Sequence, residues 1–144
     1  MARLNIVFPE NSLATVNVPV RITDINYGNH LGNSNIVEII HEARMQFLKS
    51  HSYSEMNAGG ISLIMSDLQV EYKNESYYGD NLTIKIFAGD VSRVSFELLY
   101  QAVTVRDGKE LIIINAKTGL VGYNYDLKKI VALTPELLSI LLTN

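Results

Sequence analysis

The sequence contains no cysteine, no tryptophan and only three prolines among its 144 residues. The absence of cysteine excludes a thiol nucleophile, a disulfide framework and any zinc or iron–sulfur site with cysteine ligands. Aliphatic runs such as residues 111–114 are far too short to span a membrane, so we expect no membrane insertion. The first ten residues lack the apolar stretch of a signal peptide, and we therefore expect a cytoplasmic location.

Basic residues are also few. Lys and Arg number 12 against 15 Asp and Glu, which gives a net charge of −3 and a pI near 5.6. Proteins that bind nucleic acid need a basic surface for the phosphates, so we expect no nucleic-acid partner. An apolar share of 47% is typical of a folded globular protein. No repeat, linker or low-complexity segment divides the chain, and we expect residues 1–144 to form one domain.

Residues 33–49 predict the single long helix, because their apolar side chains recur at the spacing of one helix face. The members of this stripe are Ile36, Ile39, Ile40, Ala43 and Phe47. Three polar residues at the start, Asn33, Ser34 and Asn35, can cap the helix.

Four segments, residues 15–22, 61–72, 82–87 and 94–104, alternate apolar and polar residues with the period of a half-buried strand. Asp107-Gly108 predicts a hairpin turn, and the isoleucine-rich residues 109–123 are expected to form the return strand. A short helix over residues 135–142 follows, with Thr134 as its N-cap and Pro135 at its first position. One helix followed by successive antiparallel strands predicts an α+β fold in which the sheet covers the apolar helix face. The exposed sheet edge would then be buried against a second copy of the chain.

Residues 24–33 (DINYGNHLGN) concentrate reactive side chains directly before the long helix. Backbone N–H groups at a helix N-terminus favour negative charge, so they could stabilise an oxyanion. Asp24 and His30 could supply a base or orient a water molecule. The three histidines lack the spacing of helical metal-ligand pairs, and we expect no metal site.

These features resemble the hotdog-fold acyl-CoA thioesterases, the group around 4-hydroxybenzoyl-CoA thioesterase. The matching stretches are residues 21–33, the helix ending at residues 41–44, residues 70–82 with their Gly79-Asp80 turn, and residues 131–137. The resemblance implies a hotdog fold, in which a five-stranded antiparallel sheet wraps a long helix and a short C-terminal helix follows. It also implies a homodimer or a dimer of dimers, with the active site at the dimer interface and the thioester carbonyl against the N-terminus of the long helix.

The loop differs from the family pattern at the position of the catalytic acid. In the branch that the chain resembles, the loop reads D-x-D-x-x-G-H, and its second acid is the catalytic carboxylate. Aligned on His30, the first acid is Asp24, but Asn26 stands at the second position and cannot act as a base. In plant-type acyl carrier protein thioesterases, the Asp and Asn of a related loop fall on Asn26 and Gly28, and the His falls on His30.

Three assignments of the catalytic groups follow. Asp24 could itself be the base, or His30 could activate water while Asp24 or Asn26 holds its ring. Alternatively, Glu42 on the helix could supply the carboxylate, as helix-borne acids do in other hotdog branches. We favour Asp24 and His30 acting together.

The resemblance thus implies an acyl-CoA thioesterase that hydrolyses a thioester of coenzyme A to a free acid and a thiol. Coenzyme A would take part only within the substrate, and no cofactor is expected. Asn26, Tyr27 and Asn33 are expected to contact the substrate, with the Asn33 region offering the oxyanion-binding amide. The absence of a G-x-S-x-G motif disfavours a serine-hydrolase route. The alternatives are a non-catalytic hotdog protein that binds acyl-CoA or another hydrophobic ligand, and a hotdog dehydratase of acyl thioesters.

Overall fold

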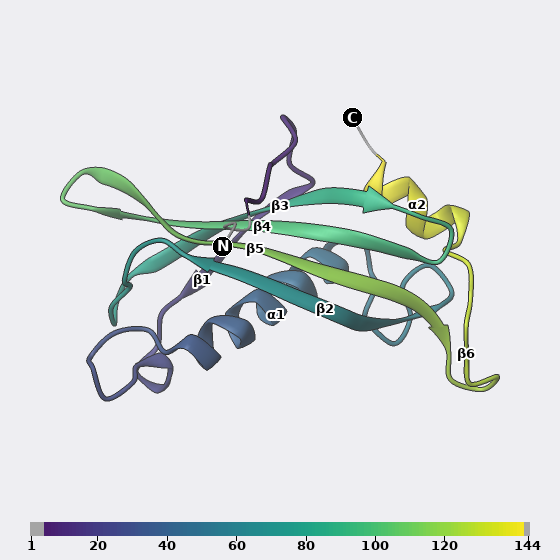
Figure 1. Ribbon diagram of the computed structural model, residues 1–144, viewed down its shortest axis with the longest axis horizontal. Coiled ribbons are helices and arrows are strands. Elements are labelled where there is room, and N and C mark those ends of the chain that lie inside the picture. The colour runs from purple at the N-terminus through teal and green to yellow at the C-terminus, as the bar shows by residue number, and fades with distance from the viewer. Residues whose placement is uncertain (1–4, 143–144) are drawn as a thin grey trace.

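The computed structural model describes residues 5–142, in which one long helix lies along one face of an antiparallel sheet (Figure 1). In chain order the elements are β1 (Ala14–Pro19), the 3-10 turn η1 (Ile22–Asp24), α1 (Asn33–Ser50), β2 (Ser62–Tyr72), β3 (Asn81–Val91), β4 (Ser95–Arg106), β5 (Lys109–Asn124), β6 (Lys129–Ile130) and α2 (Pro135–Leu141). The sheet order is β1-β3-β4-β5-β2, and the two-residue strand β6 pairs with β5. The predicted α+β fold is confirmed, with the short strand β6 added to the five expected.

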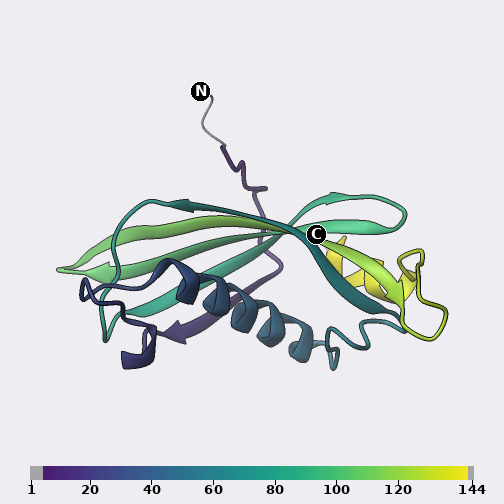
Figure 2. The same cartoon turned by 60° about the horizontal axis from the view of Figure 1, so that its bottom comes forward.

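The core lies between α1 and the inner face of the sheet. The predicted helix stripe is confirmed, because each of its five members is at most 3% exposed. Facing it are alternate residues of β3 and β4, which include Leu82, Ile84, Leu98 and Tyr100. Figure 2 shows the N-terminal segment on the opposite face of the sheet, where Phe8 packs on Phe87 with ring centroids 5.0 Å apart. Within residues 5–142, no helix is long and apolar enough to cross a membrane.

The β2 edge of the sheet is less well covered than the β1 side. Helix α1 contacts β1 and β3, whereas β2 has β5 as its one strand partner in the part of the chain described. Met65 and Tyr72 lie opposite the inward-facing Leu120 and Ile114 of β5, yet they are 40% and 54% exposed. An apolar strip of the inner face therefore lies open beside α1.

The predicted caps differ between the two helices. Thr134 caps α2 as predicted, since its Oγ1 accepts a hydrogen bond from the Leu137 N–H at 3.3 Å. At α1 the N-cap is instead Gly32, and no side chain caps this end among residues 5–142. The side chain of Asn35 is engaged elsewhere, because its Nδ2 donates to the Thr23 carbonyl at 3.3 Å. The first N–H groups of α1 are consequently left without a side-chain acceptor.

We expect Gly59→Ala to lower the free energy of unfolding by about 2 kcal/mol. Gly59 has a φ of +65°, and a Cβ there would lie 2.8 Å from the Leu137 nitrogen and 2.9 Å from Thr134 Oγ1. The added methyl group would therefore disrupt the α2 cap as well as strain the backbone. Gly108→Ala is the matched control, because Gly108 has a φ of +76° with no atom within 4 Å of a Cβ. Urea unfolding measures both variants, and equal losses would contradict this account.

Candidate functional site

A cavity of about 260 Å³ opens beside the N-terminus of α1. Its walls come from the loop before α1, the first turns of α1, the end of β2 with the loop that follows it, and β5. The apolar lining residues are Leu31, Ile36, Ile113 and Ile114, whereas the polar ones include His30, Asn33, Tyr72, Lys73 and Glu75. Small-molecule sites usually combine an apolar lining with convergent polar groups, and this cavity has both, with polar residues in the majority.

The loop that presents His30 is folded on itself by Asn26. The Asn26 side-chain Oδ1 accepts hydrogen bonds from the backbone N–H of Gly28 at 2.8 Å and of His30 at 3.5 Å. The Asn26 N–H donates to the His30 carbonyl at 2.9 Å. Asn26 thus shapes the loop with both its backbone and its side chain, and Tyr27 projects from the tip, fully exposed.

His30 and Glu75 meet at the mouth of the cavity although they come from different loops. His30 Nε2 lies 3.8 Å from Glu75 Oε1, and its Nδ1 lies 3.4 Å from the Leu31 carbonyl oxygen. The Leu31 N–H donates to the Ser76 carbonyl at 2.7 Å, which ties the two loops together next to this pair. The side chains of His30 and Glu75 are 33% and 61% exposed, so both remain accessible to a ligand.

Asp24 lies on a different side of the loop from His30. Its buried carboxylate accepts a hydrogen bond from the Arg21 N–H at 2.8 Å, with the Arg21 guanidinium 3.4 Å away. Its carbonyl accepts from the Gly32 N–H at 3.0 Å. Asp24 therefore closes the turn η1 and fixes the residue at which α1 begins.

Glu42 shares a cavity with Asp24 and not with His30. This second cavity, of about 400 Å³, lies between β1 and the polar face of α1. Within it, Glu42 accepts a hydrogen bond from Gln46 Nε2 at 2.7 Å. Of the site residues predicted from the sequence, Asp24 and Glu42 line this second cavity, whereas His30 and Asn33 line the cavity at the start of α1.

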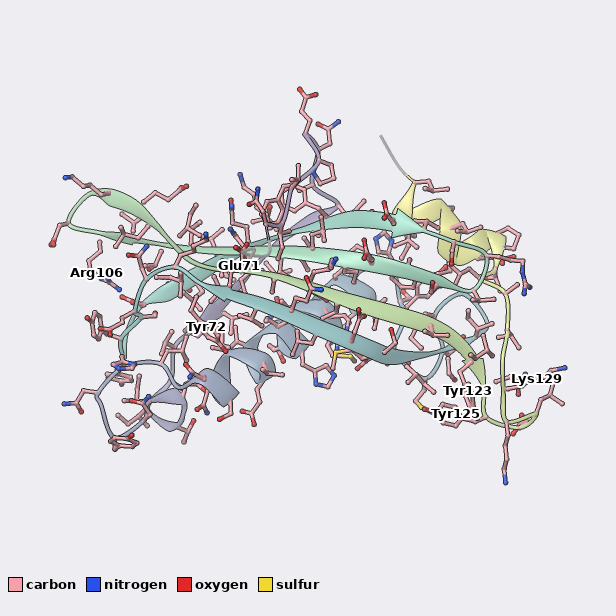
Figure 3. All side chains as sticks on the ribbon, viewed as in Figure 1. Glu71, Tyr72, Arg106, Tyr123, Tyr125 and Lys129 are labelled. Atoms are coloured by element: carbon pink, nitrogen blue, oxygen red, sulfur yellow. The ribbon has the colours of Figure 1, made fainter. Side chains whose placement is uncertain are left out.

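Tyr72 closes the cavity on the β2 side. Its hydroxyl donates to the Asn33 carbonyl at 3.2 Å, and partial burial raises the pKa of Tyr72. Figure 3 shows Tyr72 at the end of the molecule where α1 begins, with Tyr123 and Tyr125 at the opposite end. Tyr72 and Asn33 thus line the cavity at the end of α1 where the first N–H groups have no side-chain cap.

Sequence reasoning did not single out Glu75 as a functional residue. It lies in a polar loop between two strands, far along the chain from His30, and no local pattern joins the two. A β-bulge brings it into place: Ile113 is the extra residue in β5, and its carbonyl accepts from the Lys73 N–H at 2.9 Å. The one feature of the sequence that could have indicated Glu75 is its place within the matched stretch 70–82, in the loop that follows the tyrosine strand.

Asp80 holds the loop that carries Glu75. Its Oδ2 accepts hydrogen bonds from Ser76 Oγ at 2.8 Å, the Tyr77 N–H at 2.9 Å and Arg106 Nη2 at 2.5 Å. Burial alone would raise the pKa of Asp80, but these hydrogen bonds from Tyr77, Ser76 and Arg106 hold it below its usual value. The loop after β2 is thereby fastened to the end of β4.

Asp80→Asn should lower the free energy of unfolding by about 1–2 kcal/mol at pH 7. The lowered pKa in the folded state means that the carboxylate stabilises the fold above its unfolded pKa of about 3.9. This contribution is lost as pH falls through the folded value, so the difference from wild type should shrink below about pH 4. Urea unfolding at pH 7 and pH 3 measures it, with the exposed Asp90→Asn as control. A difference of the same size at both pH values would contradict the assignment.

Comparison with known proteins identifies a family match along most of the chain and similar folds among solved structures. The model of the thioesterase-like superfamily matches residues 20–141. Among solved structures, a 1,4-dihydroxy-2-naphthoyl-CoA thioesterase from Synechocystis is 18% identical with a TM-score of 0.77, and the match covers 88% of this chain and 93% of that one. A hypothetical protein from Staphylococcus aureus, in complex with CoA, is also 18% identical with a TM-score of 0.77, covering 95% and 85%. No protein of curated function matches the chain by sequence.

Proposed function

Because the chain belongs to the thioesterase-like superfamily, we propose that it is an acyl-CoA thioesterase, which hydrolyses a thioester of coenzyme A to a free acid and a thiol. The observation that carries this proposal is the cavity that His30 and Glu75 line together with Gly32 and Asn33, at the uncapped N-terminus of α1. The hotdog fold shared with CoA thioesterases, and with a protein in complex with CoA, supports the substrate class.

His30 and Glu75 are placed to activate a water molecule. With its proton on Nδ1, next to the Leu31 carbonyl, His30 presents Nε2 as an acceptor 3.8 Å from Glu75 Oε1. Two acceptors at this separation suit a water molecule that donates one hydrogen to each. In the proposed reaction the water oxygen attacks the thioester carbonyl carbon while its proton passes to His30 Nε2. The negative charge of Glu75 stabilises the imidazolium that forms.

The start of α1 provides the electrophilic half of the site. The tetrahedral intermediate carries a negative oxygen, which the free N–H groups of the first turn, beginning at Asn33, would stabilise. Collapse of the intermediate breaks the C–S bond and expels the thiolate, which takes the proton from His30. The acyl group would lie on the apolar lining formed by Leu31, Ile36 and Ile114.

We further propose that the functional unit is a homodimer or a dimer of dimers. The β2 edge has no second strand partner among residues 5–142, and apolar Ile64 and Met65 are exposed on its two faces. A second copy paired along β2 would complete the sheet and cover the open strip of the inner face. Tyr72, which closes the cavity, belongs to this strip, so the partner would approach the site.

The other assignments from the sequence stay predictions. Asp24 and Glu42 remain candidate catalytic carboxylates, and Asn26 and Tyr27 remain candidate substrate contacts. The geometry favours Glu75 over Asp24 and Glu42, because Glu75 alone of the three shares a cavity with His30. The absence of a cofactor, the cytoplasmic location and the extent of the domain are likewise predictions.

The test is release of free thiol from short, medium, long and aromatic acyl-CoAs, followed with a thiol-reactive dye. We expect turnover on at least one member of the panel. Saturable acyl-CoA binding without thiol release would contradict hydrolysis and support a binding protein. A change in the acyl chain without thiol release, seen with a hydroxyacyl-CoA, would support a dehydratase instead.

A further inference from the structure

The Glu75 carboxylate is held from the side opposite His30. The Tyr77 hydroxyl donates a hydrogen bond to Glu75 Oε2 at 3.1 Å, while Oε1 is the oxygen that faces His30. Glu75 is 61% exposed, so packing does not fix its side chain. A specific hydrogen bond is therefore needed to keep one oxygen directed at the histidine.

Tyr77 is itself held in place by Arg106, at the end of β4. The Arg106 guanidinium carbon lies 4.8 Å from the centroid of the Tyr77 ring, within the range of a cation–π contact. Arg106 also donates from Nη2 to Asp80 and, at 3.3 Å, to the Glu75 carbonyl. Figure 3 places Arg106 at the same end of the molecule as Tyr72. The phenol ring, which is 42% exposed, is thus held against the end of β4 by this contact.

We infer that Tyr77 is a positioning residue for the thioesterase reaction: its hydroxyl keeps the Glu75 carboxylate turned toward His30. This inference rests on the proposed function and adds a residue that does not line the cavity. The hydrogen bond to Glu75 and the negative charge of Glu75 raise the pKa of Tyr77, the direction expected for a phenol that donates to a carboxylate.

The kinetic test is Tyr77→Phe, which removes the hydroxyl and keeps the ring beneath Arg106. We expect kcat for thiol release to fall about fivefold, the factor for one typical net hydrogen bond, with KM nearly unchanged. In a Glu75→Gln background the same substitution should have no further effect, because Tyr77 acts through that carboxylate. Tyr78→Phe is the matched control, since Tyr78 is an exposed tyrosine in the same turn.

A second readout does not depend on activity. In protein labelled with ¹³C at tyrosine Cζ, with the Tyr77 signal assigned by its loss in Tyr77→Phe, the Tyr77 hydroxyl should deprotonate at lower pH in Glu75→Gln than in wild type. An unchanged titration would overturn the contact on which the inference depends.

The outcomes separate this inference from the proposed function. Wild-type protein that releases no thiol from any acyl-CoA overturns the proposed function, and the inference with it, whatever the titration shows. An active wild type with a fully active Tyr77→Phe variant overturns the role of Tyr77 alone. Equal losses from Tyr77→Phe in the wild-type and Glu75→Gln backgrounds would also overturn it, because they indicate a structural effect.

Discussion

Replacing His30 by alanine should lower kcat/KM for thiol release by about 10²–10⁴-fold, the usual contribution of a general base. His30 is the one histidine that lines the cavity at the start of α1, and its Nε2 faces both the Glu75 carboxylate and the proposed water position. Because its ring is one-third exposed and lies at the mouth of the cavity, we expect the variant to fold normally. The measurement is steady-state thiol release on the best substrate of the panel.

His51→Ala is the control for this experiment. His51 is an exposed histidine at the C-cap of α1, and its ring packs edge-on to the Phe47 ring with centroids 5.4 Å apart. We expect this variant to keep wild-type activity. A loss of less than about threefold in His30→Ala would exclude His30 as the base.

Glu55→Ala should lower the free energy of unfolding by about 3 kcal/mol, the lower end of the range for breaking a buried ion pair. The Arg44 side chain on α1 is only 5% exposed, and its Nε donates to Glu55 Oε2 at 3.3 Å. Its Nη1 donates to the Tyr100 hydroxyl at 3.3 Å, and Tyr100 in turn bonds Thr118 at 2.7 Å. Removing Glu55 would leave the buried guanidinium charge without the one counter-ion that it has among residues 5–142.

The double variant Arg44→Met with Glu55→Ala separates the charge from the packing. If the uncompensated charge causes the loss, replacing Arg44 by an apolar side chain of similar length should recover most of the stability. Urea unfolding of wild type, Glu55→Ala and the double variant measures this. A double variant less stable than Glu55→Ala would contradict the explanation.

Local periodicity was enough to predict the elements that form the frame of this site. The apolar stripe on α1 and the alternation in the strands both arise because one face of each element is buried. This pattern can be recognised from the residues of each segment alone. The start of α2 at Thr134 and Pro135 could also be predicted, because a helix start depends on a few adjacent residues. The loop 24–33 was also correctly expected to lead into the N-terminus of α1.

The partners of the polar side chains could not be predicted in this way. His30 meets Glu75 only because the Leu31 N–H bonds Ser76 and a bulge at Ile113 anchors the loop after β2. The Arg44–Glu55 pair is similar: a charged pair near the end of a helix usually indicates a solvated surface, yet here Tyr100 and Thr118 of the sheet complete a buried network.

The measurement that tests the central claim most directly is a comparison of three carboxylate-to-amide variants, Asp24→Asn, Glu42→Gln and Glu75→Gln. Each is assayed for kcat on the same acyl-CoA, with unfolding curves to separate activity from stability. We predict that Glu75→Gln loses about 10²-fold in kcat with unchanged stability. Glu42→Gln should stay near wild type, and Asp24→Asn should act mainly through stability. A fully active Glu75→Gln beside a stable but inactive Asp24→Asn or Glu42→Gln would contradict the account.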